Sequence, residues 1–145
     1  MSTFLAKPGS LPDNWYIIDA AGVPLGRTAV KAANILRGKH RPEFTPNVDS
    51  GEHVIIINAK DAVVTGNKAD DKKYYRVTGY IGHMKETNYK TMLQTKPTRA
   101  MELAVWGMLP HNTLGRKQYK KLKVYAGAEH GHEAQKPIVL EREGN

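Results

Sequence analysis

The chain has 145 residues, which suffices for one domain with a buried core and leaves little room for a second. It carries 22 Lys and Arg against 14 Asp and Glu, a formal charge of +8 that indicates an anionic partner such as nucleic acid. Cysteine is absent, which excludes disulfides, thiolate zinc sites and cysteine nucleophiles. Neither a signal peptide nor the roughly 20 apolar residues of a membrane span is visible, so we predict a cytoplasmic protein.

The first predicted elements are a strand and a helix. Residues 15–19 are β-prone and are followed by a turn with Gly and Pro. Apolar residues then recur at positions 25, 29, 32, 33 and 36, the spacing of one helix face, while Arg27 and Lys31 fall on the opposite face. Gly38 stands where a C-cap glycine is expected, so we predict that the helix ends there and that residues 39–42 form a basic loop.

Three more strands are predicted further along the chain. Residues 53–58 form an unbroken aliphatic run, which is typical of a strand covered on both faces in a parallel sheet. Residues 74–80 are β-prone and alternate in character, which predicts a more exposed third strand. Residues 122–126 alternate as a last strand, and we expect the remainder of the chain to be a polar tail.

Two more helices are predicted between the third and fourth strands. Pro97 is suited to the first turn of a helix, in which Met101 and Met108 share one face. Apolar residues on the other sides predict that this helix is buried and that Met108 belongs to the core. Residues 111–121 resume helical spacing with basic residues close together on one side.

These elements predict an α/β fold of three layers in a single domain over residues 1–145. Its small four-stranded sheet, mostly parallel or mixed, would contain all four predicted strands and carry helices on both faces. We expect short extensions at residues 1–14 and 128–145.

The positive charge is concentrated in two segments. Residues 25–41 and 111–128 hold ten bases and no acid, whereas the rest of the chain holds 12 bases and 14 acids. Such segregation favours phosphate neutralisation over a merely solvated surface. Lys68, in a predicted turn, would be one further phosphate contact. The expected contacts of the first segment are Arg27, Lys31, Arg37, Lys39, His40 and Arg41. Those of the second segment are Arg116, Lys117, Lys120, Lys121 and Lys123.

Other sites in the sequence are less specific. Residues 79–82 match the GXXG loop of KH domains, but so short a pattern arises easily by chance and a turn is favoured. Glu129, His130, His132 and Glu133 lie in a tail that contains glycine rather than at fixed spacing on a helix. A polar tail is therefore favoured over a metal site, and we predict no cofactor.

Two other classes of protein remain open from the residues alone. A basic enzyme acting on a phosphorylated substrate would need a pocket with a perturbed base, and no nucleophile elbow or P-loop is present. An anionic-membrane binder would need aromatic anchors on the apolar face of a basic helix. The helix from Leu25 has mainly alanines there, which fits a protein core better than a bilayer, so we expect no membrane partner. Because the sequence shows no catalytic motif, we also expect no small-molecule substrate.

The segment VWGMLPHNTLGR at residues 105–116, followed by LKVYAG at 122–127, resembles the hallmark of the L13 family of large-subunit ribosomal proteins. Shorter matches stand in the family's order elsewhere in the chain. They are residues 15–20, 25–27, 36–40, 45–49 and 65–68. Trp106 departs from the pattern, since a basic residue is common there, as do His83, where glycine is frequent, and Gly131, where proline is frequent.

The resemblance implies a bacterial-type cytoplasmic protein of the large ribosomal subunit. It implies binding to large-subunit ribosomal RNA, contact with neighbouring large-subunit proteins and an early place in subunit assembly. It also implies helices on both sides of a small sheet, no catalysis and no cofactor. The two basic segments would then be two RNA-binding faces that hold separate RNA segments together.

Overall fold

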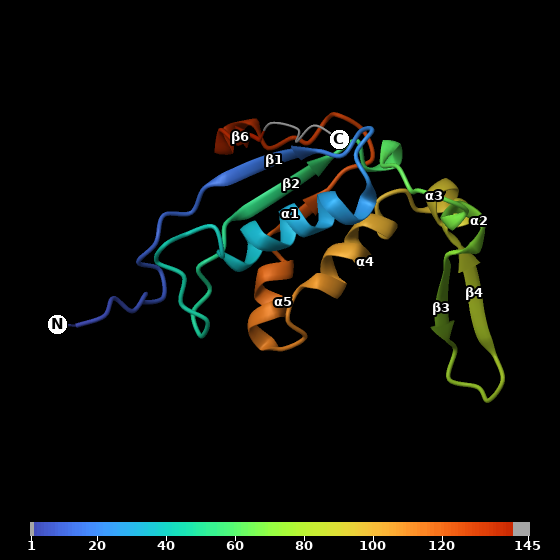
Figure 1. Cartoon of the computed structure of the whole chain (residues 1–145), viewed down its shortest axis with the longest axis horizontal. Helices are drawn as coiled ribbons and strands as arrows, with labels where there is room; N and C mark the ends of the chain where they lie inside the picture. The colour runs from blue at the N-terminus through green and yellow to red at the C-terminus, as the bar shows by residue number, and fades with distance from the viewer. Residues whose placement is uncertain (1, 141–145) are drawn as a thin grey trace.

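The computed structural model describes residues 2–140, and its centre is a four-stranded sheet in the order β5-β2-β1-β6 (Figure 1). All three pairings are parallel, and Trp15 in β1 lies opposite His53 in β2. Because side chains alternate along a strand, the even-numbered residues face one side of this sheet and the odd-numbered residues the other. The strands are β1 (Trp15–Asp19), β2 (His53–Ile57), β5 (Leu122–Val124) and β6 (Ile138–Val139). The predicted α/β class with a mostly parallel four-stranded sheet is confirmed.

Helix α1 (Leu25–Arg37) crosses the even-numbered face of the sheet and buries the five positions predicted from its spacing. Gly38 ends the helix with φ 82° and donates its N–H to the carbonyl oxygens of Asn34 and Ile35. A side chain at Gly38 would bring its Cβ within 2.6 Å of the Ser50 carbonyl oxygen. The cap therefore needs glycine both for its left-handed backbone and for the close approach of the loop before β2.

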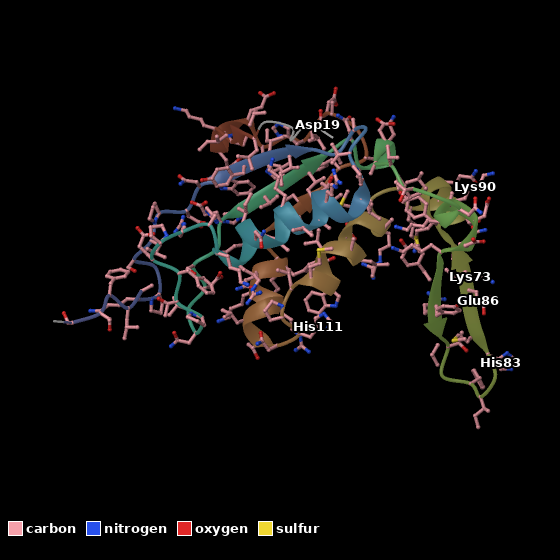
Figure 2. The ribbon with its side chains drawn as sticks, viewed as in Figure 1. Asp19, Lys73, His83, Glu86, Lys90 and His111 are labelled. Carbon is pink, nitrogen blue, oxygen red and sulfur yellow. The ribbon has the colours of Figure 1, made fainter. Side chains whose placement is uncertain are left out.

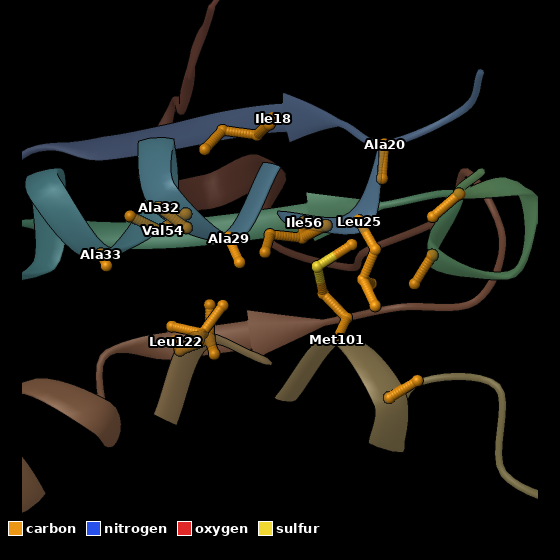
Figure 3. Close-up of a cluster of buried hydrophobic side chains, with 14 of the residues drawn as sticks. Ile18, Ala20, Leu25, Ala29, Ala32, Ala33, Val54, Ile56, Met101 and Leu122 are labelled. Carbon is orange, nitrogen blue, oxygen red and sulfur yellow. The ribbon is translucent and has the colours of Figure 1, made fainter. Parts of the chain in front are cut away.

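The core lies between the sheet and two helices (Figure 3). Ile18, Val54 and Ile56 point from the sheet toward α1, and Met101 enters from α4 (Arg99–Met108), which packs against α1. Met101 and Val105 are fully buried. Alanines at positions 29, 32 and 33 of α1 leave room for this close packing of helix on sheet.

Met108 is 39 % exposed, so the prediction that it belongs to the core was wrong. It shares a helical face with Met101, but it is the last residue of α4 and lines a shallow groove beside Lys68 and Lys72. Spacing along a helix identifies a face, whereas the length of helix that is covered depends on the neighbouring elements.

The two methionines form a matched pair for testing the core. We expect Met101→Ala to lower the free energy of unfolding by about 2–5 kcal/mol, because it removes a fully buried side chain and leaves a cavity. Met108→Ala should cost about 1 kcal/mol or less. Urea unfolding followed by circular dichroism measures both, and equal losses in the two variants would contradict the described packing.

A separate hairpin of β3 (Lys73–Val77) and β4 (Met84–Asn88) projects from the body (Figure 1). It is flanked by α2 (Lys68–Asp71) and α3 (Tyr89–Thr95). The prediction that residues 74–80 join the main sheet was wrong, because this strand pairs antiparallel with β4 across a short turn. Lys73 and Glu86 lie on the same face of the hairpin with 3.5 Å between Nζ and Oε2 (Figure 2).

The odd-numbered face of the sheet is covered by the segment after β5. His132 stacks on Trp15, which stacks in turn on His53 with ring centroids 4.3 Å apart. Among residues 2–140 the helical structure in this segment is the single turn η2 (Glu133–Gln135). The prediction of a polar tail after the fourth strand was wrong at residues 138–139, which form β6, and residues 141–145 lie outside the described part. The limits of the two extensions stay a prediction.

Candidate nucleic-acid interface

The first basic segment follows the outer side of α1. Arg27 is exposed, Lys31 and Arg37 are half-buried, and Lys39 is exposed immediately after the Gly38 cap. Their positions follow from the helix, since its opposite side is filled by apolar residues. Arg27 and Lys39 are therefore fully accessible to a partner at the surface, and Lys31 and Arg37 are partly accessible.

His40 and Arg41, from the same segment, are instead engaged by Glu52, which is 1 % exposed. His40 Nε2 lies 2.6 Å from Glu52 Oε2, and the Arg41 guanidinium donates to Glu52 Oε1 and to the Pro12 carbonyl. Asn14 donates to the same carboxylate at 2.9 Å. This cluster joins the N-terminal segment to the loop after α1 and to the start of β2. His40 and Arg41 therefore hold these segments together within the protein.

Burial alone would raise the pKa of Glu52, but hydrogen bonds from Arg41, His40 and Tyr16 outweigh it and hold the pKa below its ordinary value. Because the pKa is lower in the folded than in the unfolded chain, ionised Glu52 contributes stability above pH 4.5, and this contribution is lost as the pH falls through the folded-state pKa. We expect the difference in unfolding free energy between wild type and Glu52→Gln to shrink below pH 4.5. Urea titrations between pH 7 and pH 3 measure it, and a constant difference would count against the cluster.

The second basic segment is centred on α5 (Thr113–Tyr119). Asn112 caps this helix by accepting a hydrogen bond from the Gly115 N–H at 2.8 Å. A Cβ on Gly115 would lie 1.6 Å from the Pro110 carbonyl oxygen, so glycine lets the helix start tightly against the turn. Exposed cations follow at the end of the helix, and none has an acid partner within residues 2–140. They are Arg116, Lys117 and Lys120.

Lys121 and Lys123 differ from these three cations, the first in its partners and the second in its position. Lys121 Nζ is 3.2 Å from Asp49 Oδ2 and donates to the Gly51 carbonyl oxygen at 3.1 Å, so it ties the loop before β2 to the end of α5. Lys123 lies opposite Ile55 in the sheet and therefore on the odd-numbered face. Burial lowers the pKa of His132 on the same face, and the nearby charges of His130 and Lys123 lower it further. The second segment thus presents charge on two different sides of the molecule.

The two basic segments meet at one groove of about 480 Å³, which also involves the N-terminal residues. Lys117 lines the groove from α5, and Lys121 lines it from the segment that follows α5. Arg41 contributes from the loop after α1, and Lys7 adds a cation from the N-terminal segment. Asp13 and Asp49 lie in the same lining. The sequence gives no sign that Lys7 belongs to this surface, because it stands alone among uncharged residues.

Lys68 lies apart from this groove. It opens α2 and lines the shallow groove beside Met108, together with Lys72. Its side chain is exposed, on the side of the molecule that carries the hairpin, and the predicted phosphate contact stays a prediction. The predicted contacts therefore spread over several surfaces rather than two.

The features that suggested other functions take ordinary places in the fold. Residues 79–82 form the turn of the projecting hairpin, with Gly79 at φ 93° and Gly82 at φ 78°. Residues 2–140 contain no group of three or more His, Cys, Asp or Glu side chains placed to hold a metal ion. Over the same residues, every helix is too short or too polar to cross a membrane.

Comparison of the sequence with known proteins identifies one family. The family described as ribosomal protein L13 matches residues 13–131. The chain belongs to the ribosomal protein L13 family. A large ribosomal subunit protein uL13 from Desulfitobacterium hafniense is 60% identical over 139 residues, covering 96% of this chain and 97% of the relative. Similar proteins of that name from Moorella thermoacetica and Hydrogenovibrio crunogenus are 59% and 55% identical over 141 residues, with 97% of this chain and at least 98% of each relative covered.

Membership of the L13 family confirms the resemblance noted in the sequence. It makes the chain a structural protein of the ribosome rather than an enzyme, and the bacterial ribosome is a cytoplasmic particle. The motif at residues 105–116, which carried the resemblance, forms the end of α4, the Pro110 turn and the start of α5. The most recognisable residues of the family thus build the corner from which the cations of α5 project.

Proposed function

We propose that the chain binds large-subunit ribosomal RNA through the exposed cations of α1 and α5 and supports early assembly of the large subunit. The observation that carries this proposal is the row of exposed bases on α5 without an acid partner in residues 2–140. Like charges three or four residues apart on a helix repel each other, and phosphates lying across them remove that cost.

The shape of the surface supports recognition of folded RNA by its backbone. Cations on rigid helices can fix the position of phosphates, while the major groove of a regular RNA duplex is too deep and narrow for side chains to read its base edges. The groove between the N-terminal segment and α5 is lined by Lys7 and Lys117, so cations from two distant parts of the chain can hold phosphates there. His40, Arg41 and Lys121 would serve this surface by holding its loops in place rather than by direct contact.

Contact with neighbouring large-subunit proteins is part of the same proposal. The projecting hairpin supports it, because Val77, Tyr80 and Ile81 are 73%, 77% and 102% exposed at its outer end. Exposed apolar clusters of this kind are typical of interaction surfaces.

Binding of the purified chain to fragments of large-subunit ribosomal RNA across a salt series tests the proposal. We expect a saturable preference for particular fragments over unrelated RNA of equal length. The logarithm of the association constant should fall by roughly 4–8 per decade of salt, as five to eight phosphate contacts require. Weak binding of equal strength to every RNA would overturn it.

A further inference from the structure

A groove between α4 and α5 contains aromatic rings that the phosphate contacts proposed above do not use. Trp106 near the end of α4 and Tyr119 at the end of α5 are both half-buried, with ring centroids 5.2 Å apart at an angle of 68°. His111 lies in the turn between the helices (Figure 2). Its ring stacks on Trp106 with ring centroids 4.9 Å apart at an angle of 12°. Its Nε2 also lies 3.1 Å from the Trp106 carbonyl oxygen. The indole ring is therefore held in one orientation before any partner arrives.

Cations surround this aromatic pair. The groove has a volume of about 370 Å³ and is lined by Arg99, Leu103, Trp106, Arg116, Tyr119 and Lys120. Arg99 is paired with Glu102 at 3.4 Å, whereas Arg116 and Lys120 have no acid partner in the described residues. The Tyr119 hydroxyl is protonated at neutral pH, as in any tyrosine, and burial raises its pKa further, so it can donate a hydrogen bond. Volumes of about 300–1,000 Å³ are typical of sites for small ligands.

The combination of aromatic rings and unpaired cations distinguishes possible occupants. An apolar segment of another protein would bury the rings but would also desolvate Arg116 and Lys120 without a counter-charge. An unpaired nucleotide satisfies both parts, because its base stacks on aromatic rings and its phosphate pairs with the cations. A base within a duplex has no free face to offer.

We propose that this groove binds one unpaired nucleotide of the RNA, with the base against Trp106 and Tyr119 and the phosphate on Arg116 and Lys120. This inference rests on the proposed RNA binding and adds a site that reads a flipped-out base rather than the backbone.

Tryptophan fluorescence tests the site directly. The chain has two tryptophans, so Trp106 is the single indole in a Trp15→Phe variant of the full-length protein. Large-subunit ribosomal RNA and a single-stranded oligoadenylate should both quench its emission, and a blunt RNA duplex of equal length should not. Emission unchanged by all of these probes, or changed only after neighbouring ribosomal proteins are added, would overturn the proposal.

Affinity variants separate stacking from charge. We expect Trp106→Leu to weaken binding to large-subunit ribosomal RNA about 5- to 150-fold, with the salt dependence unchanged, and Trp106→Phe to keep most of the affinity. Arg116→Gln with Lys120→Gln should weaken binding and make the salt dependence shallower by about two phosphate contacts, while Trp106 remains in place as the reporter. If Trp106→Leu binds like wild type while wild type prefers its fragments, the base site fails and the proposed function stands. If wild type shows no fragment preference, the proposed function itself fails.

Discussion

Replacing Lys39, Arg116, Lys117 and Lys120 together with glutamine is expected to weaken binding to large-subunit ribosomal RNA about 10³-fold near 0.15 M salt. The four side chains are exposed, and none is paired with an acid in residues 2–140, so their charge is available to phosphates. Each lost contact removes the release of roughly one counterion, and the slope of log K against log salt should fall by about 3–4. Filter binding over a salt series measures both quantities.

A second variant with the same change in charge provides the control. Lys60, Lys85, Lys90 and Lys96 are also exposed, but they lie outside the α1 and α5 surfaces. Their replacement with glutamine should leave fragment preference intact and change the slope much less. Equal losses in the two variants would mean that total charge, rather than the arrangement of cations on α1 and α5, governs binding.

Glu52→Ala is expected to lower the free energy of unfolding by about 3–5 kcal/mol, a loss typical of breaking a buried ion pair from one side. The Arg41 side chain, 9 % exposed, would keep its charge without a partner, and the hydrogen bonds from His40 and Asn14 would be lost. The hydrogen bond from Arg41 to the Pro12 carbonyl, which holds the N-terminal segment against the loop after α1, would also be weakened. Thermal and urea unfolding measure the loss.

Glu86→Ala is the matched control for this change. Glu86 also forms an ion pair, with Lys73, but both side chains are 48 % exposed. Solvent screening reduces such a pair to about 0–1 kcal/mol, so we expect little effect on unfolding. A loss at Glu52 as small as that at Glu86 would show that the carboxylate is not the centre of a buried network.

Elements that depend on local spacing were predictable from the sequence. Helix α1 repeats its apolar positions at helical spacing and ends at a glycine, and both signals come from neighbouring residues. The hairpin was misassigned because the alternation at residues 74–80 is the same whether the strand pairs with the main sheet or with β4. Strand β6 was missed because Ile138 and Val139 are too short a run to show any period.

At the candidate site, too, only features that depend on neighbouring residues were predictable from the sequence. Close spacing of bases near the end of α5 predicted exposed cations, and Arg116, Lys117 and Lys120 are exposed. Nothing near Glu52 in the sequence indicates that it is buried, because its burial depends on the N-terminal segment and on the loop after α1. The pairing of Lys121 with Asp49 is equally non-local. Sequence therefore located the charged surface but not which of its cations are already neutralised.

β1 lies between β2 and β6, so one of its two edges is paired by residues that are synthesised more than a hundred positions later. β1 can pair with β2 early, whereas Tyr16 and Ile17 gain their other partners only when Ile138 and Val139 have been made. Until then one edge of β1 offers unpaired N–H and C=O groups that can pair with another nascent chain. Ile138 and Val139 thus protect the edge of β1 from pairing with other chains. A chain truncated before residue 138 is expected to aggregate through this edge.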